Sequence, residues 1–209
     1  MIVEIFEAGP LATNGYLVAD REGGRAVMID APQGVAALVV EQARQWKTPI
    51  EFLINTHGHW DHFLDNAELL RLTGAKFGIH RDSVPLLKEP QARYFGLDLD
   101  VEVTEPDFFL EEGKTFAVGD LKFEIFNCPG HCPGSAVLFE RKGRVAFVGD
   151  VLFAGSIGRT DLPGGEHDLL IDGIRKKLFS LGDDVKVFPG HGPVTTIGEE
   201  RRSNPFLAG

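Results

Sequence analysis

One short segment of the sequence concentrates residue types that bind metal ions. Residues 55–62 read NTHGHWDH and hold three of the seven histidines of the chain, with an aspartate just before the last of them. His57 and His59 follow an apolar run, and side chains two residues apart in an extended chain point to the same side. Both imidazoles can therefore reach one metal ion.

Asp61 and His62 stand where the chain turns into a predicted helix, so their adjacent side chains diverge from the first point. We therefore expect them to serve a second, neighbouring metal ion. The arrangement differs from the H-E-x-x-H motif, in which two histidines one helical turn apart bind a single metal. A simpler role for Asp61 alone is that of N-cap of the helix that follows.

Three further residues of ligand type stand where predicted strands give way to tight loops. His131 lies in CPGHCPG, Asp150 ends VAFVGD, and His191 lies in VFPGHGP. Either histidine alone would be more typical of a turn residue. Five of the seven histidines at such positions indicate a metal centre, and histidines with a shared carboxylate suit each of two sites.

The remaining candidates have structural interpretations. His80 and His167 are expected to be structural or surface residues. Cys128 and Cys132, the only cysteines, are expected to be small packing residues. They do not indicate a disulfide framework, and a reducing cytoplasmic setting fits them better.

The composition excludes several classes of protein. The 209 residues suit one domain over 1–209, and a net charge of −10 argues against a nucleic-acid partner. No apolar stretch reaches the roughly 20 residues that span a bilayer, so no membrane partner is expected. The N-terminal MIVEIFEAGP lacks the basic and long apolar regions of a signal peptide.

Apolar periodicity predicts strands and helices that could position these residues. Predicted strands cover 2–6, 15–19, 25–30, 50–56, 76–80, 135–140, 144–150 and 185–189, with a hairpin over 114–128 that turns at Gly119 and Asp120. Predicted helices cover 34–46, 63–74 and 166–181. Segment 81–112 is expected to be a short helix plus loop. Its Tyr94, Phe95 and Phe108 are expected to form a wall of the cleft or, equally, to pack internally or at a dimer contact.

This mixture of strands and helices predicts an α/β protein with two sheets covered by helices. AVMIDAP and VAFVGDV echo each other as apolar strands that end in an aspartate.

The motif His57-Gly58-His59-Trp60-Asp61-His62, followed in order by His131, Asp150 and His191, resembles the metallo-β-lactamase superfamily over essentially the whole chain. The resemblance implies a four-layer αββα sandwich with metals at the sheet edges. It assigns one metal to His57, His59 and His131. It assigns a second to Asp61, His62 and His191, with Asp150 bridging the two.

Within that superfamily, the sequence resembles glyoxalase II-like proteins, the hydroxyacylglutathione hydrolases. The segments that carry the likeness are CPGHCPGSAVLF, GDVLFAGSIGRTDLPGG and PGHGPVTTIGEERRSNPF. Asp150 argues against the lactam-hydrolysing branch of the superfamily. The resemblance implies cleavage of a small-molecule thioester such as S-D-lactoylglutathione. The C-terminal helical region that contacts glutathione in that family does not follow SNPFLAG, which leaves glutathione specificity open.

The expected chemistry uses two divalent metal ions, with zinc expected first and iron or manganese compatible with the same ligands. They would supply a hydroxide at neutral pH, oriented by Asp61 and Asp150 as catalytic carboxylates. A thiolate leaving group, with a conjugate-acid pKa of about 8.5–9, needs no strong general acid. Arg159 is expected either to bind a substrate carboxylate or to pair with Asp161.

Rival functions remain open. Persulfide dioxygenases resemble the sequence as well and hold one iron through the counterparts of His57, His131 and Asp150. The PGHGP loop and the NPFL ending favour the hydrolase. Phosphodiester hydrolysis is disfavoured by the acidic charge. A non-enzymatic metal module predicts a closed site, whereas two carboxylates among seven ligands suggest open coordination positions.

Overall fold

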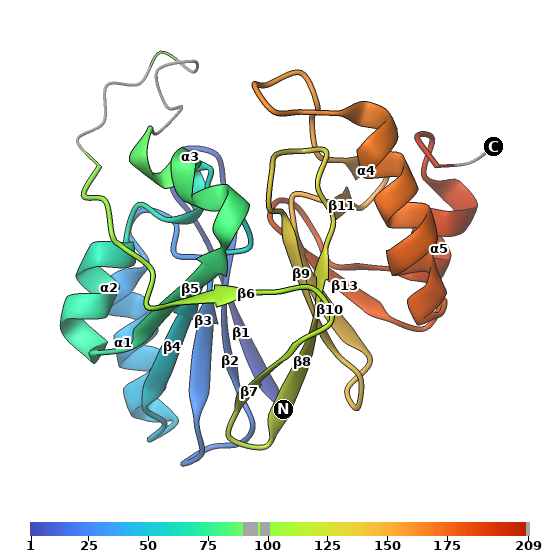
Figure 1. Cartoon of the computed structure of the whole chain (residues 1–209). Helices are drawn as coiled ribbons and strands as arrows, with labels where there is room; N and C mark the ends of the chain where they lie inside the picture. The colour runs from blue at the N-terminus through green and yellow to red at the C-terminus, as the bar shows by residue number, and fades with distance from the viewer. Residues whose placement is uncertain (90–95, 97–100, 208–209) are drawn as a thin grey trace.

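Two six-stranded β-sheets form the framework of the computed structural model, which describes residues 1–89, 96 and 101–207 (Figure 1). The first sheet has the order β1 (Ile2–Ala8), β2 (Thr13–Ala19), β3 (Ala26–Ile29), β4 (Ile50–Ile54), β5 (Lys76–His80) and β6 (Phe108–Leu110). The second has the order β14 (Thr195–Thr196), β13 (Lys186–Pro189), β10 (Val145–Gly149), β9 (Ala136–Glu140), β8 (Leu121–Asn127) and β7 (Thr115–Val118). A separate hairpin pairs β11 (Leu152–Phe153) with β12 (Ser156–Ile157).

Helices cover the outer face of each sheet. On the first sheet these are α1 (Ala36–Gln45) and α2 (Asn66–Thr73), and on the second α4 (His167–Gly173) and α5 (Ile197–Ser203) (Figure 1). A π-helical turn over Ile174–Leu178 and a 3₁₀ turn over Phe179–Leu181 continue α4, while α3 (Val84–Lys88) lies near the upper end of the first sheet. None of the described helices is long and apolar enough to cross a bilayer.

Three apolar cores separate these layers, which confirms the predicted αββα sandwich. One core lies between the first sheet and its helices, one between the two sheets, and one between the second sheet and its helices. Strand β9 shows how one apolar run serves two of them. Val137 and Phe139 face the helical side, whereas Ala136 and Leu138 face the first sheet, because successive strand side chains alternate between faces.

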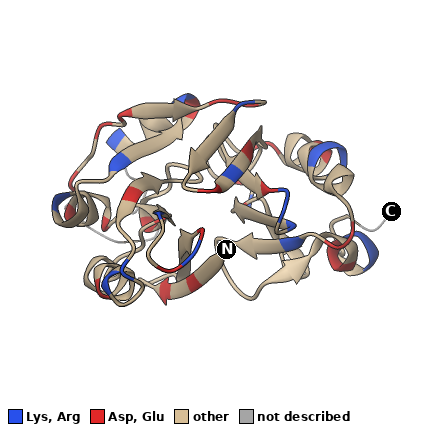
Figure 2. Cartoon of the chain, turned by 90° about the horizontal axis from the view of Figure 1, so that it is seen from below, with Lys and Arg blue, Asp and Glu red and all other residues tan. Residues whose placement is uncertain are grey.

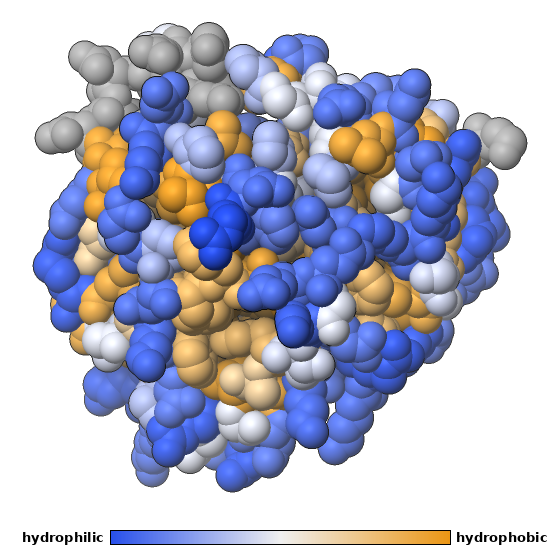
Figure 3. Space-filling view, in the orientation of Figure 1, coloured by the Kyte–Doolittle hydropathy of each residue, from blue (hydrophilic) through white to orange (hydrophobic). Residues whose placement is uncertain are grey.

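The surface of the sandwich is mixed in charge and locally apolar. Lysine and arginine alternate with aspartate and glutamate in the view from below (Figure 2). Apolar surface shows in the centre of the face where the edge strands β6 and β7 lie (Figure 3). There the ring of Phe108 stacks on that of Phe116 with 5.8 Å between centroids. Phe108 is thus part of an aromatic contact between the sheets; Tyr94 and Phe95 lie outside the described residues.

The longer predicted elements are confirmed, with shifted ends. The helix predicted from residue 63 begins at Asn66 because Trp60–His62 forms a 3₁₀ turn first. It ends as predicted at Gly74, whose φ of 67° is left-handed. The helix predicted over 166–181 begins at His167 and changes type after Gly173. Strands β6, β11, β12 and β14 and helix α5 were not predicted.

Candidate metal centre and its cavity

Loops at one edge of the two sheets bring the seven candidate ligands together. Residues 57–62 follow β4, His131 lies between β8 and β9, Asp150 follows β10, and His191 follows β13. Six of the seven side chains are buried and that of His191 is 26% exposed. The cluster therefore lies at the junction of the sheets, with only one member substantially open to solvent.

The first group consists of His57, His59 and His131. His59 Nδ1 lies 3.1 Å from His57 Nε2 and 2.7 Å from His131 Nε2. Three ring nitrogens this close to one another could hold a cation between them. The pairing of His57 with His59 has the geometry that their spacing in the sequence predicted.

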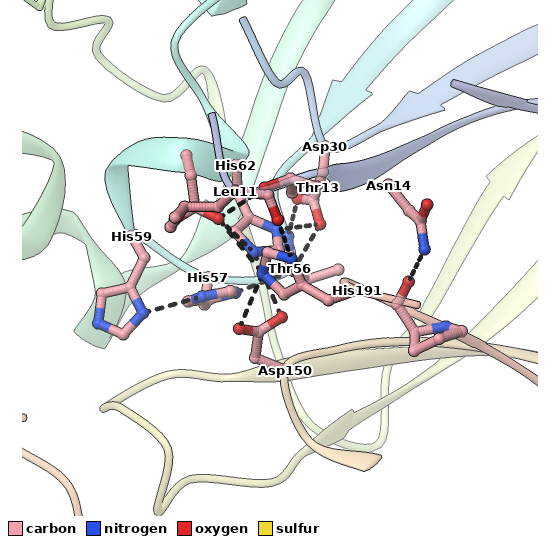
Figure 4. Close-up of polar contacts among 12 residues, drawn as sticks. Leu11, Thr13, Asn14, Asp30, Thr56, His57, His59, His62, Asp150 and His191 are labelled. Carbon is pink, nitrogen blue, oxygen red and sulfur yellow. Dashed lines mark hydrogen bonds and ion pairs between the residues drawn. The ribbon is translucent and has the colours of Figure 1, made fainter. Parts of the chain in front are cut away.

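The second group consists of Asp61, His62 and His191. Asp61 Oδ2 lies 3.5 Å from His62 Nε2 and 3.3 Å from His191 Nε2. Asp150 lies between the groups, since its oxygens are 3.3 Å from His62 Nε2 and 3.4 Å from His191 Nε2 (Figure 4). Its Oδ2 also lies 3.6 Å from His131 Nε2. That these side chains bind metal ions remains a prediction.

Second hydrogen bonds orient the rings of the cluster. His131 Nδ1 donates to the carbonyl of Arg159 at 2.7 Å, and His191 Nδ1 donates to the carbonyl of Leu11 at 3.1 Å. A ring that donates through Nδ1 presents the lone pair of Nε2 to the cluster, as in metal-binding histidines. Both rings therefore fit a ligand role.

Asp30 orients the ring of His62 in the same way. It was not among the predicted site residues. Its Oδ2 lies 2.9 Å from His62 Nδ1, and the Thr56 hydroxyl and backbone N–H each donate to its carboxylate at 2.8 Å (Figure 4). Asp30 is 1% exposed and has a positive φ of 58°. The signal in the sequence was the echo of AVMIDAP and VAFVGDV, because both strands deliver an aspartate to the cluster.

The structure excludes the N-cap role for Asp61. Asp61 lies within the 3₁₀ turn, and Asp65 occupies the N-cap position of α2. Asp61 Oδ2 instead accepts a hydrogen bond of 2.7 Å from the Thr13 hydroxyl. Thr13 was also missed, since its partner lies 48 positions away in the sequence.

The electrostatics of the first group suit neutral imidazole ligands. Burial, reinforced by the neighbouring His131, lowers the pKa of His59 to about 3. Burial likewise lowers the pKa of His57 and of His131. The three rings are therefore neutral at physiological pH, with lone pairs available to a cation.

The second group behaves in the opposite way. Burial alone would lower the pKa of His191, but Asp150 and Asp61 raise it to about 10. Burial would also lower the pKa of His62, but the surrounding carboxylates raise this pKa well above its usual value. Cation binding here would replace these protons. Among the described residues, His62 Nε2 and Asp150 Oδ1 are buried and lie 3.3 Å apart without the geometry of a hydrogen bond, so the residues present fit a cation.

The two cysteines have different surroundings. Cys128 packs in the core between the second sheet and its helices, as expected. Cys132 contacts the Ser135 hydroxyl at 3.4 Å, yet its sulfur also lies within 4.8 Å of the ligand atoms of the first group. His80 accepts a backbone hydrogen bond from Asp82, which fits its structural interpretation.

A cavity of about 420 Å³ opens beside the cluster. Beyond the cluster, its walls are mostly apolar and come from Leu11, Trp60, Phe153, Ser156, Ile157, Arg159 and Leu162. Arg159 also pairs with Asp161 through two contacts of 2.7 and 2.8 Å. The structure thus shows the predicted ion pair and, in addition, places Arg159 where a substrate could reach it.

Comparisons with known proteins agree with this geometry. The family model described as the metallo-beta-lactamase superfamily matches residues 8–191. The hydroxyacylglutathione hydrolase GloC of Haemophilus influenzae is 39% identical over 211 residues, which cover 99% of this chain and 98% of the relative.

Solved structures cover the chain as fully. BLEG-1, a B3 metallo-beta-lactamase, has a TM-score of 0.92 at 34% identity over all of both chains. TTHA1623 in a di-iron-bound form has 0.87 at 34% identity over 98% of this chain and 100% of the other. ETHE1 from Myxococcus xanthus has 0.84 at 26% identity over 100% of this chain and 85% of the other.

Proposed function

The chain belongs to the metallo-beta-lactamase superfamily, and on that premise we propose that it is a metal-dependent hydrolase of thioesters, with S-D-lactoylglutathione as the first substrate to test. The observation that carries the proposal is the pair of ligand groups that share Asp150 beside a largely apolar cavity. The 39% identity to GloC over nearly the whole chain supports a hydroxyacyl thioester in particular.

The residues present define how two ions would be held. His57, His59 and His131 would hold the first, and Asp61, His62 and His191 the second, with Asp150 shared between them. Such ions, when bound, polarise a carbonyl group and lower the pKa of water. Zinc and iron suit these ligands equally, and the likeness to the di-iron form of TTHA1623 supports iron.

The side chains around the ions would bind and orient the substrate. Thr13 fixes one oxygen of Asp61, so that Asp61 and Asp150 can act as the catalytic carboxylates that orient the attacking water. With a substrate bound, the largely apolar cavity walls would limit the access of bulk water to the reacting carbonyl. Arg159 is the cation that we propose for a substrate carboxylate, and it would exchange part of its pairing with Asp161 on binding.

The location that we propose is the cytoplasm. Both cysteines are free and buried, which is consistent with a reducing compartment.

The direct test is hydrolysis of S-D-lactoylglutathione by protein loaded separately with zinc, iron or manganese, followed through loss of thioester absorbance. We expect saturable turnover that a chelator abolishes and the metal restores. Hydrolysis of a β-lactam should be tested in parallel, because the similar structure BLEG-1 is a B3 metallo-beta-lactamase. Full metal loading without thioester turnover would contradict the proposal.

An iron-dependent persulfide dioxygenase is the second candidate, and the likeness to ETHE1 favours it. It requires one iron per chain, held by His57, His131 and Asp150. Metal stoichiometry and oxygen consumption with glutathione persulfide separate the two candidates. Oxygen uptake with one iron, and no thioester hydrolysis, would establish the second.

A further inference from the structure

The hairpin of β11 and β12 forms one wall of the cavity. It contributes Phe153, Ser156 and Ile157 to the lining. The ring of Phe153 meets that of His191 edge-on, with 6.0 Å between centroids. The hairpin thus contacts both the cavity and a proposed metal ligand. Strands of two residues are too short to be stable by themselves, so other contacts must hold the hairpin in place.

Helix α5 and the residue after it supply those contacts. Glu200 accepts a hydrogen bond of 2.8 Å from the backbone N–H of Gly155, at the turn of the hairpin. The Asn204 amide donates at 2.9 Å to the carbonyl of Ser156 and at 2.8 Å to the Glu200 carboxylate. Two side chains therefore bind the backbone of two consecutive residues, where the turn passes into β12.

These two side chains form a completed polar network within an apolar surrounding. Glu200 is 1% exposed and Asn204 is fully buried. The other oxygen of Glu200 accepts a hydrogen bond of 2.6 Å from the Thr195 hydroxyl. A buried carboxylate is costly unless donors satisfy it. Removal of the Glu200 carboxylate would leave the buried Thr195 hydroxyl and the buried Asn204 amide without this acceptor and would release Gly155. The position of the hairpin is therefore sensitive to both residues.

From this geometry we infer that Glu200 and Asn204 are positioning residues for the substrate cavity. They hold the β11–β12 hairpin so that Phe153 and Ile157 form the wall against which the substrate binds. Neither residue lines the cavity, so both act through the hairpin. That the wall binds a thioester rests on the proposed function, whereas the anchoring of the hairpin does not.

The experiment compares the metal-loaded wild-type protein with Glu200→Gln, Asn204→Ala and the matched control Glu199→Gln. Glu199 lies on the same helix with an exposed side chain, so the control makes the same chemical change outside the network. Hydrogen exchange of residues 152–157 measures the anchoring directly. Thioester kinetics measure its consequence. If Glu200→Gln does not fold, Asn204→Asp takes its place. That substitution replaces the amide that donates to the Ser156 carbonyl by a carboxylate oxygen, which cannot donate.

We expect hairpin amides to exchange about tenfold faster in both network variants, because each loses a hydrogen bond that anchors the hairpin backbone. We expect them to exchange at the wild-type rate in the control. We expect KM to rise about tenfold and kcat to stay within about threefold, because the altered wall acts on binding. Unchanged exchange would overturn the anchoring. Faster exchange with unchanged KM would overturn the role in substrate binding. Absence of thioester turnover in the wild-type protein would instead contradict the proposed function, while the exchange rates still decide the anchoring.

Discussion

Asp30 illustrates at the scale of a single residue how a neighbouring group orients a proposed metal ligand. Its carboxylate is held by Thr56 and in turn faces Nδ1 of His62. This leaves Nε2 of His62 directed at Asp61 and Asp150. The ring can hardly turn without leaving a buried carboxylate with one partner fewer.

Asp30→Asn should therefore weaken binding of the second ion. The amide keeps the size of the side chain but removes the negative charge, so we expect about a 10- to 100-fold loss of affinity, typical for partners of metal-bound histidines. Competition with a chromophoric chelator measures it. Asp120→Asn, at a side chain that is 82% exposed, is the matched control, and equal affinities in the two variants would contradict the role of Asp30.

Asp150→Ala probes the residue that lies between the two ligand groups. It removes the oxygens that face His62, His131 and His191. We expect loss of the second ion and of nearly all turnover, measured by metal analysis and by the thioester assay. A variant that keeps two ions and full activity would refute the bridging role.

At the scale of elements, the backbone of the loop after β13 lies so close to the cluster that Gly190 has no room for a side chain. A Cβ added at Gly190 would overlap Asp150 Oδ1 and lie 2.7 Å from His62 Cε1. Only a glycine lets the backbone that carries His191 pass between these ligands. The PGHGP segment thus forms a turn and, at Gly190, also requires a residue without a side chain.

Gly190→Ala should accordingly disturb both ligand groups. We expect at least about a tenfold loss of metal affinity, because Asp150 or His62 must move, with metal content after dialysis as the measurement. Gly173→Ala serves as control, since an added Cβ there meets Cys128 at an ordinary 3.7 Å. Retention of both ions by Gly190→Ala would show that the loop can adjust.

The length of an element decided how well the sequence predicted it. Strands of four to seven residues and helices α1 and α2 show enough apolar periodicity to be located, and the loops after the strands placed the ligands. Strands β11, β12 and β14 have two residues each, too few for any period. The wall of the cavity was therefore not predictable, although the cluster beside it was.

Residues that support the proposed ligands or the cavity wall were harder to predict than the ligands for a related reason. Thr13, Asp30 and Glu200 owe their roles to contacts between segments that are distant in sequence or to a helix that was not predicted. Threonine, aspartate and glutamate are common at turns and caps, so their types alone carry no signal. The histidines differ because they are few, because three of them stand within six positions, and because His131 and His191 each follow a predicted strand.

At the scale of the whole molecule, each ligand group draws on both sheets. His57 and His59 follow a strand of the first sheet, and His131 lies in a loop of the second. The other group is divided in the same way between Asp61 and His191. An ion bound at either place would connect the two halves of the sandwich, so metal binding should be linked to global stability.

Removal of metal should therefore lower the melting temperature of the whole chain. At free metal about 100-fold above Kd, each ion contributes about 2.7 kcal/mol, or about 5–10 °C for a chain of this size. Calorimetry of metal-loaded and chelator-treated protein measures the shift. Coincident melting curves at full loading would show that the ions do not connect the halves.

The division of ligands between the sheets has a further consequence for the chain when it is cut. The connection between β6 and β7 spans residues 111–114, and cleavage there would give two pieces, each with an incomplete set for either ion. Neither piece alone could reconstitute the centre. Mixed together, they would form a two-part reporter whose reassembly depends on the metal, with ion concentration controlling how firmly the halves rejoin.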